Sequence, residues 1–264
     1  MADQPGQPPS NLPNLPNLPN LSALTLKPRD QLTRQASDGR YCLDTKDKLD
    51  PCQSSVVLQR NALPMLSGEF EQAERFMQED VRQDTMMGNM VPRKQCTFGP
   101  VQYKRYQLVK DESQWPSIVH RVREATRQFA AQLGIPNPEE YTGVHANYYV
   151  DGDSKVPKHS DAEKQLVSGA PIFSFTYLVS DNRSLARDFS IWKMPSAGDA
   201  VEGTGRKGSL ADITLYSGDL LIMTGDMQKY FNHSIEPQTR PVAARLNFTV
   251  RKFVSHKEAH ARKM

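Results

Sequence analysis

A histidine and an aspartate separated by one residue, His159 and Asp161, could bind a metal ion together. On a strand and the turn after it, both side chains can converge on one ion, and His233 from a distant strand could add a second imidazole. Two histidines and one carboxylate leave coordination positions open, which non-haem Fe(II) sites use to bind a co-substrate and O2. The chain has six histidines and thirty acidic residues, so a chance pair on the surface is the alternative.

The segment Arg245–Arg251 carries a polar side chain at every second position. Strand alternation places Arg245, Asn247, Thr249 and Arg251 on one face. A guanidinium can hold a carboxylate through two parallel hydrogen bonds. If Arg245 held the far carboxylate of a keto acid such as 2-oxoglutarate in this way, the keto end could chelate the iron. A strand that faces solvent would show the same alternation and is the alternative interpretation.

The elements that would position these residues change character near Pro136. Before it, two apolar stripes at helical spacing predict amphipathic helices, one beginning after Ser67-Gly68 and one ending at Gly134. After it, short segments rich in β-branched and aromatic residues predict strands at 144–150, 171–179, 189–192, 213–216, 220–223 and 243–253. The order predicts an α+β fold, a double-stranded β-helix (jelly-roll) core with N-terminal helices packed on one face.

Composition divides the chain into three parts. Residues 1–55 contain Asn-Leu-Pro three times, and a proline at every third position favours an extended chain, so we expect a disordered tail. A partner-binding motif built on the leucines is the alternative. Residues 56–256 are expected to form one globular domain, followed by a basic tail at 257–264. A formal net charge of +3 is too small to indicate a nucleic-acid partner by itself.

The cysteines and the apolar runs predict a compartment. Cys42, Cys52 and Cys96 are odd in number and lack metal-ligand spacing, so we expect reduced thiols in a soluble intracellular protein, in nucleus or cytoplasm. No apolar run approaches the roughly 20 residues of a membrane-spanning helix. The first residues have neither a basic start nor an apolar segment, so we expect no secretory signal. We expect a monomer without membrane contact.

From about residue 85 to 254 the sequence resembles the AlkB family of Fe(II)- and 2-oxoglutarate-dependent dioxygenases. The matching motifs follow in the family's order at 91–99, 147–149, 159–161, 171–174, 187–189, 218–223 and 245–251. The first of them, VPRKQCTFG, looks like the Pro-Arg…aromatic-Gly segment of the family's nucleotide-recognition lid. Linked motifs are far more specific than one motif alone.

The resemblance implies a role for each matching residue. The catalytic Fe(II) would be bound by His159, Asp161 and His233. The 2-oxoglutarate would be bound by Asn147, Tyr149, Arg245, Asn247, Thr249 and Arg251. The substrate would contact Arg93, Phe98, Tyr103 and Glu163. Phe98 or Tyr103 would stack on an extruded base, while basic residues around the lid would bind phosphates. Ordinary core packing is the alternative for both aromatic residues.

The resemblance also implies the reaction of residues 56–256, oxidative demethylation of N-alkylated bases in DNA or RNA. Fe(II), O2 and 2-oxoglutarate would hydroxylate the methyl group, with release of succinate and formaldehyde. Two features depart from the pattern: Ala162 stands where some duplex-DNA members carry an acidic residue, and residues 181–186 form a longer segment than expected. The alternatives are the same chemistry on a non-nucleic-acid substrate such as protein, or a catalytically inactive nucleic-acid-binding module.

Overall fold

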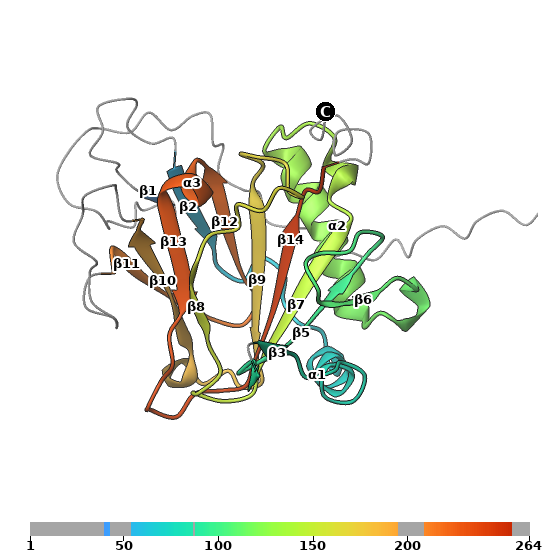
Figure 1. Cartoon of the computed structure of the whole chain (residues 1–264), viewed down its shortest axis with the longest axis vertical. Helices are drawn as coiled ribbons and strands as arrows, with labels where there is room; N and C mark the ends of the chain where they lie inside the picture. Colours follow the sequence, from blue (N-terminus) through green and yellow to red (C-terminus); the bar gives the residue numbers. More distant parts are fainter. Residues whose placement is uncertain (1–39, 43–53, 87, 195–208, 255–264) are drawn as a thin grey trace, which may run out of the picture.

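Two β-sheets dominate the computed structural model, which describes residues 40–42, 54–86, 88–194 and 209–254 (Figure 1). The larger sheet has eight strands in the order β1-β2-β12-β9-β14-β7-β5-β6, and the smaller has four in the order β11-β10-β13-β8. Strands β5 and β6 pair in parallel, and the other described pairs are antiparallel. The predicted double-stranded β-helix is confirmed.

The strands and helices have the following bounds. The larger sheet contains β1 (Arg40–Cys42), β2 (Ser54–Gln59), β5 (Lys94–Phe98), β6 (Gln107–Val109), β7 (Gly143–Tyr149), β9 (Ile172–Leu178), β12 (Asp219–Gly225) and β14 (Arg245–Arg251). The smaller sheet contains β8 (Val156–His159), β10 (Arg187–Lys193), β11 (Ala211–Leu215) and β13 (Phe231–Ile235). The hairpin β3 (Thr85–Met86) and β4 (Asn89–Met90) precedes β5. The helices are α1 (Glu69–Glu79), α2 (Ser117–Gln132) and α3 (Met227–Tyr230), with short 3₁₀ turns at Glu112–Gln114, Pro138–Glu140 and Arg183–Leu185.

The two N-terminal helices cover the outer face of the larger sheet, as the apolar stripes predict (Figure 1). Helix α2 packs on α1, β7 and β14. Gly134 follows the end of α2 with a φ of 68°, a left-handed conformation that favours glycine and ends the helix. Placing both helices on one side leaves the other face of this sheet for the smaller sheet.

Each strand of the larger sheet sorts its side chains between two layers. On β14, Leu246, Phe248 and Val250 join the core under the helices. The residues between them point into the space between the sheets, which is the polar face predicted for this strand. The space between the sheets is therefore apolar at one end, where Leu221 and Ile191 pack, and polar around β14.

Strands β1, β5, β8 and β13 are among those that the apolar pattern did not predict. Strands β8 and β13 were not among the segments predicted from apolar patterns, although the metal hypothesis placed His159 and His233 on strands or beside them. The segment expected as a lid contains β5, which pairs with β7 inside the larger sheet. Strand β1 pairs with β2 although it lies in the expected tail; the remainder of that tail up to residue 53, and residues 257–264, lie outside the described residues.

The described helices are too short and too polar for a membrane span.

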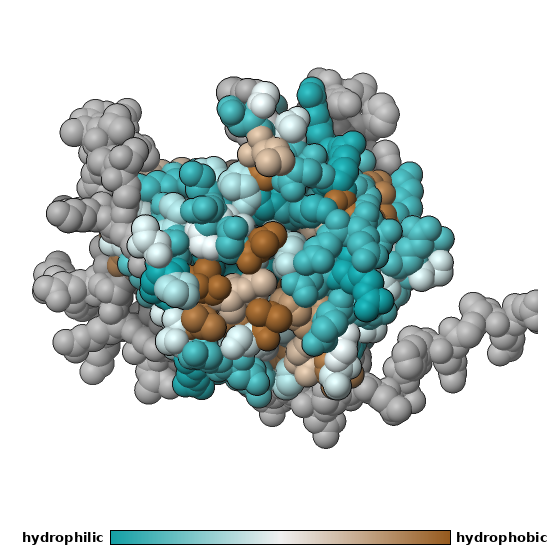
Figure 2. All heavy atoms as spheres, turned by 90° about the horizontal axis from the view of Figure 1, so that it is seen from below, coloured by the Kyte–Doolittle hydropathy of each residue, from teal (hydrophilic) through white to brown (hydrophobic). Residues whose placement is uncertain are grey.

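Two exposed apolar residues, Val150 and Val179, directly follow β7 and β9. Figure 2 shows apolar side chains gathered near the centre of the face seen from below, with polar residues around them.

Candidate functional site

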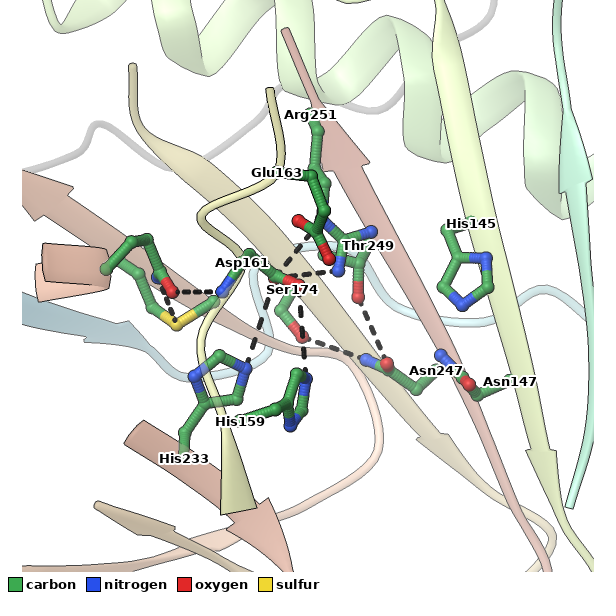
Figure 3. A network of polar contacts seen from close by, with 12 residues as sticks. His145, Asn147, His159, Asp161, Glu163, Ser174, His233, Asn247, Thr249 and Arg251 are labelled. Atoms are coloured by element: carbon green, nitrogen blue, oxygen red, sulfur yellow. Dashed lines mark hydrogen bonds and ion pairs between the residues drawn. The ribbon is translucent and has the colours of Figure 1, made fainter. Parts of the chain in front are cut away.

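The pairing of β8 with β13 brings the two predicted histidine ligands together. His159 and His233 are direct partners in this antiparallel pair, and their ring centres lie 4.3 Å apart. Asp161 follows β8 by two residues, and its carboxylate oxygens lie 3.9 Å from Nε2 of His159 and 4.0 Å from Nε2 of His233. Figure 3 shows the three side chains pointing toward one another. One ligand atom from each lies within 4.8 Å of the others, which suits a single metal ion.

The protonation of both imidazoles suits metal binding. Nδ1 of His159 lies 2.9 Å from the carbonyl oxygen of Pro157, which can only accept, so the proton is on Nδ1 and Nε2 keeps its lone pair. Burial and the neighbouring His159 lower the pKa of His233 to about 3. Burial also lowers the pKa of His159. Both rings are therefore neutral near pH 7.

Asp161 is held on its side chain and on its backbone. Burial alone would raise the pKa of Asp161, but the positive charge of Arg251 holds that pKa well below its ordinary value. Arg251 donates from Nε and Nη2 to Asp161 Oδ2, at 3.1 and 2.7 Å. The Asp161 backbone N–H donates to Oε1 of Gln228 on α3, at 2.8 Å. These contacts keep a charged carboxylate beside the two histidines.

A cavity of about 640 Å³ extends from the three candidate ligands between the sheets. This volume lies within the range of roughly 300–1,000 Å³ that is typical of small-molecule sites. The cavity wall includes all six residues expected to bind 2-oxoglutarate, which lie on β7 and β14: Asn147, Tyr149, Arg245, Asn247, Thr249 and Arg251. The structure thus gathers all six around one space.

Arg245 has the properties of a carboxylate-binding residue. Its side chain is buried, and Nη2 donates to Oγ1 of Thr176 at 3.0 Å. Nε and Nη1 have no hydrogen-bond partner among the described residues. The guanidinium carbon lies 4.9 Å from the ring centre of Tyr149. Buried donors without acceptors are costly, so a carboxylate that accepts from them fits this end of the cavity.

The other β14 residues have partners within the protein. Nδ2 of Asn247 donates to Ser174 Oγ and to the Phe175 carbonyl oxygen, at 2.8 and 2.9 Å. The Thr249 hydroxyl donates to Asn247 Oδ1 at 3.1 Å. Arg251 donates to Asp161 from Nε and Nη2, and its Nη1 has no hydrogen-bond partner among the described residues. Direct contacts of these three with 2-oxoglutarate remain predictions.

The expectation that Phe98 stacks on a base is wrong. Phe98 is 1% exposed and packs between Phe76 and Trp115, at ring-centre distances of 5.4 and 5.6 Å. Alternation along β5 explains this, because Gln95 lines the cavity and Phe98 faces the core under the helices. The aromatic residue of this motif is a core residue.

The other expected substrate contacts lie around the cavity in different settings. Tyr103 lines the cavity, but it is buried and the Arg251 guanidinium lies 5.1 Å from its ring centre. Glu163 forms an ion pair with Lys104 and lines a separate hollow beside Asp161. Arg93 lines the cavity and donates to three protein acceptors. Roles for these residues in substrate binding remain predictions.

His145 and Tyr106 also line the cavity, although neither was predicted as a site residue from the sequence. Their rings stack at a centre distance of 4.7 Å and an angle of 28°. Burial lowers the pKa of His145 well below its ordinary value, so this ring is neutral. Strand alternation could have identified His145, which lies two residues before Asn147 on β7. The half-buried Tyr106 follows the exposed pair Lys104-Arg105, and with exposed Arg82 these lie along the same wall.

The sequence comparisons with known proteins agree with this geometry. The family model described as the 2OG-Fe(II) oxygenase superfamily matches residues 48–251. The mouse protein named DNA oxidative demethylase ALKBH2 is 26% identical over 211 residues, covering 78% of this chain and 82% of that protein. Its human counterpart is 24% identical, covering 78% of this chain and 75% of that protein. The solved structure of OsALKBH1 overlaps 75% of this chain and 96% of its own, at 16% identity and a TM-score of 0.47.

Proposed function

This chain belongs to the 2OG-Fe(II) oxygenase superfamily as an AlkB-like member, and on that basis we propose that it demethylates N-alkylated bases in DNA. Members of this superfamily use Fe(II), 2-oxoglutarate and O2, the cofactors predicted from the motifs. Relatives named DNA oxidative demethylase support the choice of DNA among nucleic acids.

One feature of the cavity carries the proposal: three kinds of group share one space. The first kind is the set of candidate iron ligands, and the second is the pair of unpaired donors on Arg245. The third comprises exposed Arg82 and Arg105 together with Tyr106, and all of these residues line the cavity. Exposed arginines favour phosphate contacts, and an aromatic ring can stack on an unpaired base. The combination suits an extruded or single-stranded nucleotide whose base reaches the metal.

The residues would divide the work as follows. His159, Asp161 and His233 would hold Fe(II), with neutral imidazoles and a charged carboxylate. Arg245 would hold the far carboxylate of 2-oxoglutarate and so orient its keto end toward the metal. When bound, these cofactors supply the oxidation of a methyl carbon, and succinate and CO2 are released. Tyr106 would hold the base, and the resulting N-hydroxymethyl group would release formaldehyde.

The test measures succinate and formaldehyde from purified protein with Fe(II), 2-oxoglutarate and ascorbate. N-methylated and unmethylated oligonucleotides of DNA and RNA are compared, with Asp161→Ala as the inactive control. We expect methylated DNA to stimulate both products in equal amounts. Stimulation by methylated RNA alone would move the substrate to RNA. Turnover that ignores all oligonucleotides would contradict a nucleic-acid substrate, and absence of turnover in protein that binds metal and 2-oxoglutarate would favour a binding module.

A further inference from the structure

Arg93 is fixed by hydrogen bonds to three separate parts of the protein. Nε donates to Oδ1 of Asn147 at 2.8 Å, Nη1 to the carbonyl oxygen of Lys155 at 3.0 Å, and Nη2 to Oε1 of Gln95 at 2.9 Å. Gln95 is held in turn by Asp84, to which its Nε2 donates at 3.0 Å. Each nitrogen of this guanidinium therefore has a protein acceptor, unlike a residue kept free for phosphate.

The contact with Asn147 decides which way that amide points. A guanidinium can only donate, so the oxygen of the Asn147 amide must face Arg93 and its NH2 group must face away. Asn147 is 6% exposed, and its side chain lines the cavity. Among the described residues, none accepts a hydrogen bond from its Nδ2. Arg93 therefore makes Asn147 a donor toward the cavity.

The residue opposite cannot supply this donor. Asn247 on β14 is the direct strand partner of Asn147, but its NH2 group already donates to Ser174 and Phe175. An anionic co-substrate beside these two amides would therefore accept a hydrogen bond from the NH2 group of Asn147 and not from that of Asn247. If the Asn147 amide turned by half a rotation, it would present its oxygen instead and repel a carboxylate or keto oxygen.

We propose that Arg93 is a positioning residue for the co-substrate, which acts by fixing the donor orientation of Asn147, and is not a nucleic-acid contact. This inference rests on the proposed use of 2-oxoglutarate by the cavity. It changes the role expected for Arg93 from its motif, because the side chain belongs to the wall that binds the co-substrate. Phosphate contacts then fall to exposed residues such as Arg105.

The test compares Arg93→Met with Arg105→Met, since both changes remove one guanidinium. Binding of 2-oxoglutarate is measured by calorimetry with Mn(II) in place of Fe(II), and binding of a methylated oligonucleotide by fluorescence anisotropy at several salt concentrations. We expect Arg93→Met to weaken 2-oxoglutarate about tenfold, the effect of one lost hydrogen bond to a charged group, and to leave the oligonucleotide affinity and its salt dependence unchanged. Arg105→Met should show the reverse pattern.

A double-mutant comparison distinguishes a positioning role of Arg93 from a general loss of structure in the Arg93→Met variant. In protein carrying Asn147→Ala, the further change Arg93→Met should not weaken 2-oxoglutarate any more, because the side chain through which Arg93 acts is gone. An additive loss would overturn the inference, and so would an Arg93→Met variant that keeps its 2-oxoglutarate affinity but loses oligonucleotide affinity. Failure of the unmodified protein to bind 2-oxoglutarate with Mn(II) would overturn the proposed function itself.

Discussion

Replacing Arg251 with Met should destabilise the metal-free protein strongly. The Asp161 side chain is 2% exposed, and Arg251 supplies both of the hydrogen bonds to its Oδ2. Without that guanidinium, a buried carboxylate would face two neutral imidazoles. Removal of one partner from a buried ion pair costs about 3–5 kcal/mol. For a domain of this size each kcal/mol lowers the melting temperature by about 2–4 °C, so the loss should be about 6–20 °C.

Two further conditions connect this loss to Asp161. The folded pKa of Asp161 is lowered, so its stabilising contribution is present above the unfolded pKa of about 3.9 and is lost as pH falls through the folded value. The difference in melting temperature between the original protein and Arg251→Met should therefore become smaller as the pH falls below about 4. Added Mn(II) should also reduce this difference in melting temperature at neutral pH, because the ion places positive charge beside the same carboxylate.

The measurement is thermal and urea unfolding of both proteins, with Arg82→Met as the control. Arg82 also pairs with an aspartate, but its side chain is 63% exposed and the distance to Asp84 is 3.5 Å. Exposed pairs contribute about 0–1 kcal/mol, so this variant should unfold close to the original. Equal stability of Arg251→Met and the original protein at neutral pH would refute the account of how Asp161 is held.

Four other changes test the remaining assignments. Arg245→Met should weaken 2-oxoglutarate about 10–100-fold in Mn(II) calorimetry, because charge-assisted bonds contribute about 1.5–3 kcal/mol, and equal weakening of oligonucleotide binding would contradict this role. Tyr106→Ala should cost about 1–3 kcal/mol in oligonucleotide binding measured by anisotropy, whereas unchanged binding would remove it as a stacking residue. Phe98→Ala should instead lower the free energy of unfolding by about 3–5 kcal/mol in urea. Gln228→Met should weaken Mn(II) binding about tenfold or more, while Gln228→Glu, which keeps an acceptor for the Asp161 N–H, should preserve it.

The sequence predicts the faces of the strands well because side chains alternate with a fixed period. The polar row of β14 follows directly from that period, and so does its position opposite the helices. The alternation shows which face a side chain is on, but it does not show which part of the cavity that side chain reaches. Arg245 and Arg251 share a face, yet they are six positions apart, a distance of about 20 Å along the strand. Arg245 therefore reaches Thr176, whereas Arg251 reaches Asp161.

Two further departures have physical causes that local patterns do not contain. Phe98 was assigned to the substrate from its motif, but the pairing of β5 with β7 decides which of its side chains face the helices. Strand β8, with the sequence VPKH, has a proline and a lysine where apolar alternation would mark a strand. It is a strand because β13 lies beside it. Both features depend on tertiary pairing.

Strand β8 has a neighbour on one side only, since it is the outermost strand of the smaller sheet. Its register with β13 shifts between His233 and Ile235, which leaves few paired residues to hold it. An ion bound by His159 on β8 and His233 on β13 would cross-link these two strands, as a disulfide bond between them would. Without the ion, β8 would separate from β13 more readily and uncover the edge of β13, and we expect the metal-free protein to aggregate through that edge before the helical side of the fold opens.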